Sequence, residues 1–131
     1  MKKLGLLVAA VVLLSTSAWS SEYQYISAAK LQEDISKKES GLIVDIQVED
    51  EFAAHHIDGA LATYAYPVKS DADKGKLSMA VEKAKETQDP VVIVCPRGAG
   101  GAKRTYDYLK EAGVEESRLF ILEGGQAKWP Y

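Results

Sequence analysis

The sequence predicts an α/β domain whose central sheet is largely parallel. Strand-like and helix-like segments alternate along the chain, which is typical of parallel strands joined by helices. Two of the strand-like segments, residues 42–46 and 91–94, are continuous apolar runs with at most one acid, the pattern of strands buried on both faces. The second run leads directly into Cys95, the single cysteine of the chain. These observations indicate both the fold and the place where chemistry is expected.

The first twenty residues have the pattern of a secretory signal peptide. Lys2 and Lys3 precede an apolar stretch over residues 4–14, and the small residues Ala18 and Ser20 fit a cut before Ser21. The alternative is an uncleaved membrane anchor, but the apolar stretch is shorter than the roughly 20 residues that span a bilayer. We therefore expect a domain over residues 21–131 that is exported, periplasmic in a Gram-negative source, and without stable membrane association after cleavage.

Charge and length limit the partners of the mature domain. The net charge of −3 becomes −5 once Lys2 and Lys3 are removed with the leader. An acidic domain without a basic run is not expected to bind nucleic acid or an anionic membrane. The 111 residues from 21 to 131 can bury roughly two-thirds of the surface that their unfolded chain exposes, which is enough for one core. We expect a monomer.

Local signals define the elements of the first half of this domain. Ser27 is suited to cap a helix that carries Leu31 and Ile35 on one face at a spacing of four. Gly41 ends that unit, and Asp58 with Gly59 marks a turn. The predicted elements are a strand over 23–26, a helix over 28–37, a strand over 42–46, a helix over 48–55 and a short strand over 60–64.

The second half starts with a polar segment over residues 66–75 that is predicted to be irregular. Pro90 ends a weak helix, and the following run VVIV is the strongest strand signal in the chain. Tyr106, Leu109 and Ala112 share one face of the next helix, which Gly113 is suited to end. The predicted elements are a helix over 77–85, a strand over 91–94, a helix over 102–112 and a strand over 119–122.

The six residues after Cys95, residues 96–101, form a segment that we call the cysteine loop. It contains Gly98, Gly100 and Gly101 and leads into a helix. Glycines let successive backbone N–H groups turn toward one point, and the helix N-terminus adds partial positive charge there. Such a cup holds an anion. With Cys95 at its base, the anion is a thiolate, which this environment favours, or a group bonded to its sulfur.

The count of one cysteine restricts the role of that residue further. An exported domain with a single cysteine has no internal disulfide, and a free thiol in an oxidising compartment is open to oxidation. Cys95 is therefore either buried and inert or kept for its reactivity. The glycines beside it favour reactivity.

Three motifs resemble those of the rhodanese family. The first is the strand, cysteine, loop and helix around Cys95, with Gly98 at the central glycine of the family's loop. The other two motifs are Val44-Asp45-Ile46-Gln47 with Glu51-Phe52-Ala53 and His56-Ile57-Asp58-Gly59-Ala60, and Leu122-Glu123-Gly124-Gly125 with Trp129. Their order and spacing match the family across nearly all of residues 21–131.

The resemblance implies a three-layer fold with a central parallel sheet of about five strands flanked by helices. It also implies that Cys95 takes sulfane sulfur from thiosulfate or a persulfide donor and passes it to a thiol or cyanide acceptor. No cofactor and no metal are implied, because the persulfide itself carries the sulfur. The expected substrate-binding residues are Arg97, Gly98, Ala99, Gly100 and Gly101, with Asp45 and His56 in supporting roles.

Four positions depart from the family's pattern. Gln47 stands where arginine is usual and His55 where glycine is usual, while Gly100 and Gly101 replace an arginine and a hydroxyl residue that are common there. Arg97 is therefore the only cation in the cysteine loop. We expect these departures to affect substrate choice and rate more than the sulfur chemistry.

Other functions are weighed against the same residues. A cysteine phosphatase needs an arginine six residues after the cysteine to clamp phosphate, and that position is Gly101. A thioredoxin-like redox enzyme needs a resolving thiol, which the chain lacks. A non-catalytic module that binds an anion or senses oxidants through Cys95 stays open, because the loop lacks the usual arginine and hydroxyl.

Overall fold

The computed structural model describes residues 22–131, so the predicted signal peptide, residues 1–20, lies outside the described part. Five parallel strands form one sheet in the order β1-β5-β4-β2-β3. The predicted parallel sheet of about five strands is therefore confirmed. The strands are β1 (Tyr25–Ile26), β2 (Leu42–Asp45), β3 (Leu61–Ala62), β4 (Val91–Val94) and β5 (Leu119–Leu122).

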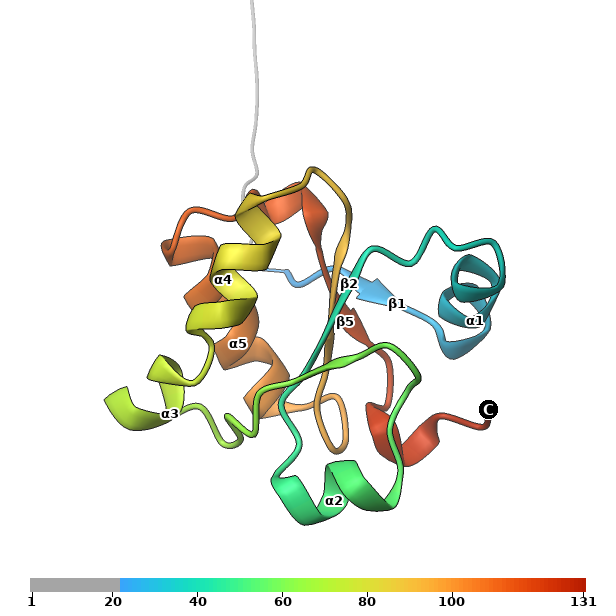
Figure 1. Ribbon diagram of the computed structural model, residues 1–131, viewed down its shortest axis with the longest axis horizontal. Coiled ribbons are helices and arrows are strands. Elements are labelled where there is room, and N and C mark those ends of the chain that lie inside the picture. Colours follow the sequence, from blue (N-terminus) through green and yellow to red (C-terminus); the bar gives the residue numbers. More distant parts are fainter. Residues whose placement is uncertain (1–21) are drawn as a thin grey trace, which may run out of the picture.

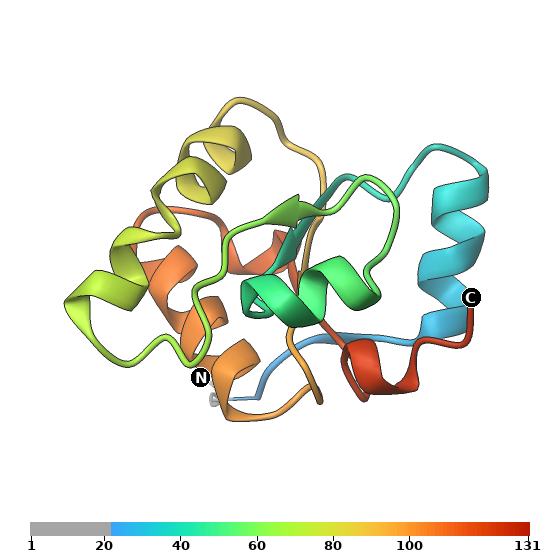
Figure 2. The ribbon, with the colours of Figure 1, turned by 60° about the horizontal axis from the view of Figure 1, so that its bottom comes forward.

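Helices cover both faces of this sheet, which gives three layers (Figure 1). α3 (Asp71–Gly75), α4 (Ser78–Lys85) and α5 (Gly100–Glu111) lie on one side, and α1 (Ala28–Ser36) lies on the other with the 3₁₀ turn η2 (Gln126–Lys128). A further 3₁₀ turn, η1 (Glu116–Arg118), precedes β5. α2 (Glu49–Ala54) sits at the end of the molecule where β4 leads into α5, and Figure 2 shows α2, the start of α5 and η2 around this end.

Alternate residues of the central strand fill the two cores, as the strand period of two requires. Val91, Ile93 and Cys95 belong to the core that includes residues of α4 and α5. Val92 and Val94 belong to the core on the α1 side. Each fully buried aliphatic side chain of this kind stabilises the fold by about 1.5–3 kcal/mol. β4 is thus fixed from both faces up to the cysteine.

Two cap predictions are confirmed. Lys30 N donates to Ser27 Oγ at 3.1 Å at the start of α1, and Gly113 follows α5 with a φ of +109°.

The predictions were wrong at two places. The segment predicted to be irregular contains α3, which Ser70 and Asp73 begin with a capping box of two hydrogen bonds, 3.0 and 3.3 Å long. α5 begins at Gly100 rather than at Ala102, so the end of the cysteine loop is helical.

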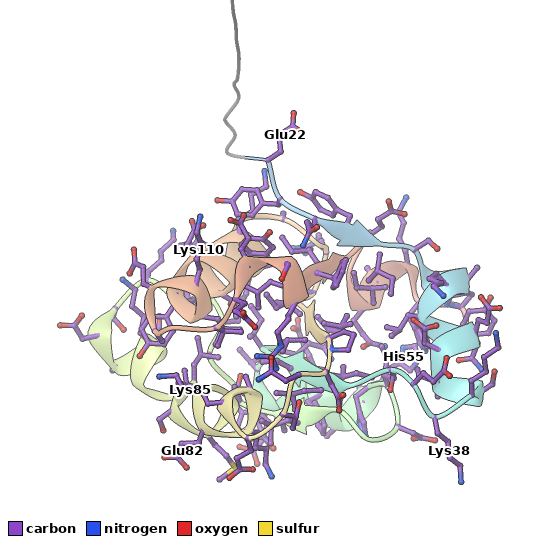
Figure 3. The ribbon with its side chains drawn as sticks, turned by 90° about the horizontal axis from the view of Figure 1, so that it is seen from above. Glu22, Lys38, His55, Glu82, Lys85 and Lys110 are labelled. Atoms are coloured by element: carbon purple, nitrogen blue, oxygen red, sulfur yellow. The ribbon has the colours of Figure 1, made fainter. Side chains whose placement is uncertain are left out.

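The surface of the described part carries many charged side chains (Figure 3). Charged side chains such as those of Glu22, Lys38, Glu82 and Lys110 lie around its periphery (Figure 3). No helix within residues 22–131 is both long and apolar enough to cross a membrane.

Candidate active site

Cys95 lies at the end of β4, where the strand leaves the sheet. Ile46 N of the neighbouring chain segment donates to Val94 O at 2.9 Å, so pairing continues to the last residue before the cysteine. The Cys95 side chain is 2% exposed and packs in the core with α5. The nucleophile predicted from the sequence is therefore held at the carboxyl edge of a parallel sheet, the usual place for ligands in α/β folds.

One backbone amide of the cysteine loop contacts the sulfur directly. Gly98 N donates to Cys95 Sγ at 2.8 Å, and among residues 22–131 this is the one hydrogen bond to Sγ. The sequence predicted several such amides. Gly98 has a φ of +70°, and a Cβ there would lie 2.8–3.0 Å from Gly124 N, Gly125 N and Leu122 O. Glycine is therefore required at this position both for its conformation and for space.

The first residues of η2 and the turn before it hold the cysteine loop through backbone contacts. Gln126 N donates to Cys95 O at 2.8 Å, and Ala127 N donates to Pro96 O at 2.9 Å. A Cβ on Gly125 would overlap Cys95 O and Gly98 N, so the two backbone segments pack without space for a side chain. Gly125 of the third sequence motif thus has a specific role, which is to let η2 hold the loop, whereas a Cβ on Gly124 would meet the Lys128 side chain.

Arg97 is exposed and faces a pocket beside the cysteine loop. The pocket has a volume of about 310 Å³ and opens between the loop, α2 and η2. Its polar lining includes a carboxylate, a guanidinium and two side-chain amides. The lining residues are Gln47, Glu51, Ala54, His55, Pro96, Arg97, Gln126 and Ala127.

Gln126 is a buried member of that wall. Its Nε2 lies 3.3 Å from His55 Nδ1. The residue is only 5% exposed, yet its Oε1 has no hydrogen-bond partner within residues 22–131. A buried acceptor without a partner costs about 1–3 kcal/mol. Neither the sequence motif nor composition distinguishes Gln126 from a surface residue.

The last residues of the cysteine loop pack against the helical side of the molecule. Gly100 and Gly101 are the first two residues of α5, and Ala99 before them is exposed and non-helical. A Cβ on Gly101 would lie 2.9 Å from the Tyr66 ring and 3.1 Å from Ile46 Cδ1. A hydroxyl or larger residue would not fit there, which explains glycine at this departure from the family's pattern.

Gly100 faces a side chain from the next turn of α5. A Cβ on Gly100 would lie 3.0 Å from Nη1 and 3.4 Å from Nη2 of Arg104. Arg104 Nε donates to Pro67 O at 2.9 Å. The neighbouring Lys103 instead lies over the Tyr23 ring, 5.6 Å from its centroid. Of these two neighbouring cations, the structure places the Arg104 guanidinium beside the loop.

Asp45 supports the backbone that follows β2. Its carboxylate is fully buried and accepts from Gln47 N at 2.8 Å and from Gln47 Nε2 at 3.0 Å. Burial raises the pKa of Asp45, and the hydrogen bonds from Gln47 and the charge of His56 lower it in part. Gln47 Nε2 also donates to His55 O at 3.1 Å. Asp45 thus orients the segment that lines the pocket, without touching Sγ.

His56 does not line the pocket beside Arg97. Its Nδ1 lies 2.7 Å from Phe52 O, and its ring stacks on the Phe52 ring at a centroid distance of 3.9 Å. It lines a different pocket of about 240 Å³ together with Trp129 and Tyr131. Within residues 22–131, no three His, Cys, Asp or Glu side chains form a cluster suited to a metal ion.

Comparison with known proteins agrees with this geometry. The family described as rhodanese-like domain has a model that matches residues 27–130. No curated protein sequence is significantly similar to the chain.

Solved structures of the same fold include three that are informative. A rhodanese-related protein from Thermoplasma volcanium is 22% identical, with a TM-score of 0.56 over 82% of this chain and 90% of that one. Thiosulfate sulfurtransferase from Pseudomonas aeruginosa is 20% identical, with a TM-score of 0.62 over 92% of this chain and 23% of that one. A human single-domain sulfurtransferase is 16% identical, with a TM-score of 0.54 over 82% and 95% of the two chains. At these identities the likeness shows the shared fold.

Proposed function

The chain belongs to the rhodanese-like domain family, and from this premise we propose that it is a sulfurtransferase that carries sulfane sulfur as a persulfide on Cys95. The observation that carries the proposal is the 2.8 Å hydrogen bond from Gly98 N to Cys95 Sγ. A backbone donor fixed at this distance stabilises negative charge on the sulfur. The same donor stabilises the negative charge that develops on Sγ when Cys95 leaves the persulfide as a thiolate.

The reaction consists of two displacements at sulfur. The Cys95 thiolate attacks the outer sulfur of thiosulfate, the S–S bond of the donor breaks, and sulfite leaves with the bonding electron pair. An acceptor nucleophile, a thiolate or cyanide, then attacks the outer sulfur of the Cys95 persulfide. The new S–S or C–S bond forms, the persulfide S–S bond breaks, and Cys95 returns as a thiolate.

Two features of the chain favour a persulfide over other fates of the thiol. Cys95 is the only cysteine in the chain, so a resolving intramolecular disulfide is impossible. The pocket of about 310 Å³ next to Arg97 is large enough for a small thiol acceptor beside the cysteine loop. We extend the proposal to a monomeric, exported domain that uses a small anionic sulfur donor.

Steady-state formation of thiocyanate from thiosulfate and cyanide tests this function. We expect turnover by the wild-type protein and none above background by the Cys95→Ser variant, because a hydroxyl cannot form a persulfide although it is close in size to a thiol. Equal thermal midpoints for the two proteins would show that the loss is chemical. A folded wild-type protein that transfers no sulfur from thiosulfate or from a persulfide donor would favour the non-catalytic anion-binding or redox-sensing module.

A further inference from the structure

We propose that Arg104 binds the oxyanion end of the sulfur donor, the –SO₃⁻ group of thiosulfate or of an organic thiosulfonate, where the cysteine loop joins α5. This inference rests on the proposed sulfur transfer. It assigns donor recognition to a residue outside the cysteine loop, nine positions after the nucleophile.

The first observation is the position of the guanidinium group. Arg104 reaches back one helical turn and lies over Gly100, with Nη1 and Nη2 at 3.0 and 3.4 Å from the place of a Gly100 Cβ. Any side chain at position 100 would meet this group. Glycine there therefore creates the space that the guanidinium occupies, at the edge of the segment whose Gly98 amide contacts Sγ.

The second observation is that the side chain is held while its outer donors stay free. Nε donates to Pro67 O at 2.9 Å, which fixes the plane of the guanidinium. Nη1 and Nη2 have no hydrogen-bond or ion-pair partner within residues 22–131. Asp107 and Glu111 line a pocket with Arg104, yet neither forms an ion pair with it. Two parallel N–H donors on a fixed plane match the geometry of a planar pair of oxygens on an oxyanion.

The third observation is the charge at the start of α5. This helix has twelve residues and no acid in its first turn. Its N-terminal end carries partial positive charge from the unpaired N–H groups. A guanidinium beside the same end is repelled by that partial charge, and an anion bound between the two would be attracted by both. Arg97 adds a further positive charge from within the cysteine loop, where it lines the pocket next to α2.

The proposal is tested with Arg104→Gln and with the matched control Lys103→Gln. Both variants lose one positive charge from the same turn of α5, but only Arg104 lies beside Gly100. We expect Arg104→Gln to lower kcat/KM for thiosulfate by roughly ten- to a hundredfold, mostly through KM, because the loss of a hydrogen bond to a charged group weakens binding by about this factor. Lys103→Gln should stay within about twofold of wild type. Arg104→Lys should fall between, because it keeps the charge and loses the fork.

A second readout does not depend on sulfur transfer. Iodoacetate and iodoacetamide both alkylate Cys95 and differ by one negative charge. In Arg104→Gln the ratio of their rate constants, iodoacetate over iodoacetamide, should fall roughly three- to tenfold, while iodoacetamide alone reacts at nearly the wild-type rate. An unchanged ratio would overturn the proposal. A lowered ratio in a protein without thiosulfate turnover would keep Arg104 as an oxyanion-binding residue and overturn the proposed function instead.

Gly100→Ala separates binding from folding. Gly100 has no positive φ, so alanine should raise the thermal midpoint through its helix propensity, while its Cβ pushes the guanidinium aside. We expect lower kcat/KM for thiosulfate in a more stable protein. Combined with Arg104→Gln, the glycine substitution should have no further effect on kcat/KM, which a double-mutant cycle measures. Additive losses would contradict the assigned contact.

Discussion

Replacing Gly125 with alanine tests whether the turn before η2 holds the cysteine loop. Gly125 has a φ of +61° and a ψ of −160°, a region that is nearly restricted to glycine and costs other residues about 1–3 kcal/mol. The added Cβ would overlap Cys95 O and Gly98 N and lie 2.7 Å from Arg97 N. Non-bonded contacts of a carbon atom are ordinarily about 3.5 Å or longer. Because these neighbours are backbone atoms, the loop must move, and overpacking of this kind costs roughly 1–3 kcal/mol more.

Gly59→Ala is the matched control. Gly59 also has a positive φ, +87°, but a Cβ there has no neighbour within 4 Å. This variant should lose about 1–2 kcal/mol from backbone conformation, partly offset because alanine reduces the entropy of the unfolded chain. Gly125→Ala should lose about 2–6 kcal/mol. The excess over the control is the cost of displacing the cysteine loop.

Urea denaturation gives the two free energies of unfolding, and thiocyanate formation reports the geometry of the loop. Under conditions where both variants are folded, Gly125→Ala should lose roughly ten- to a hundredfold in kcat/KM, and Gly59→Ala should keep wild-type turnover. If Gly125→Ala does not fold, Gly98→Ala tests the same contact from the loop side, since its Cβ would lie 2.8 Å from Gly124 N. Equal stability and equal turnover of Gly125→Ala and Gly59→Ala would refute the support role of the turn.

Two further predictions concern charge. Arg97→Ala should lower kcat/KM for thiosulfate about three- to tenfold, a smaller loss than removal of a buried contact would cause, because the side chain is exposed. Lys83→Ala removes another exposed cation and should leave kcat/KM unchanged. Equal kcat/KM values for the two variants would make Arg97 a surface charge. Burial raises the pKa of Asp45 above its ordinary 3.8. At a pH between this ordinary pKa and the raised pKa of the folded state, the native protein therefore binds more protons than the unfolded chain. The free energy of unfolding falls as pH rises through that window. Asp45→Asn lacks this titration. The difference in free energy of unfolding, variant minus wild type, should therefore grow from about pH 3 to the raised pKa and then stay level; urea midpoints against pH measure it, and a flat or falling difference would contradict the burial effect.

The fold could be predicted because its signals are local and repeated. The apolar runs 42–46 and 91–94 have a length and composition that suit buried parallel strands, and Ser27 and Gly113 mark helix ends by well-defined chemistry. The capping box of Ser70 and Asp73 is equally local, but it lies in a polar segment whose composition predicts a loop. Helix α3 was missed for that reason.

The candidate site could be predicted only in part. Cys95 and Gly98 stand out because a strand, a lone thiol and a glycine-rich segment coincide. The fit of Gly101 against the Tyr66 ring, the hydrogen bond from Arg104 to Pro67 O and the burial of Gln126 depend on segments that are distant in the sequence. No sequence pattern encodes such long-range fits. The departures of Gly100 and Gly101 from the family's pattern appeared as losses in the sequence. In the structure, they make room for Arg104 and for the Tyr66 ring.

Intact-mass spectrometry of the purified protein after incubation with thiosulfate tests the persulfide on Cys95 most directly. Sulfur transfer predicts a gain of one sulfur atom in the wild-type protein, its loss when cyanide or a thiol is added, and no gain in Cys95→Ser. A folded wild-type protein that gains no sulfur from thiosulfate or from a persulfide donor would contradict the mechanism, as would a Cys95→Ser variant that gains sulfur to the same extent.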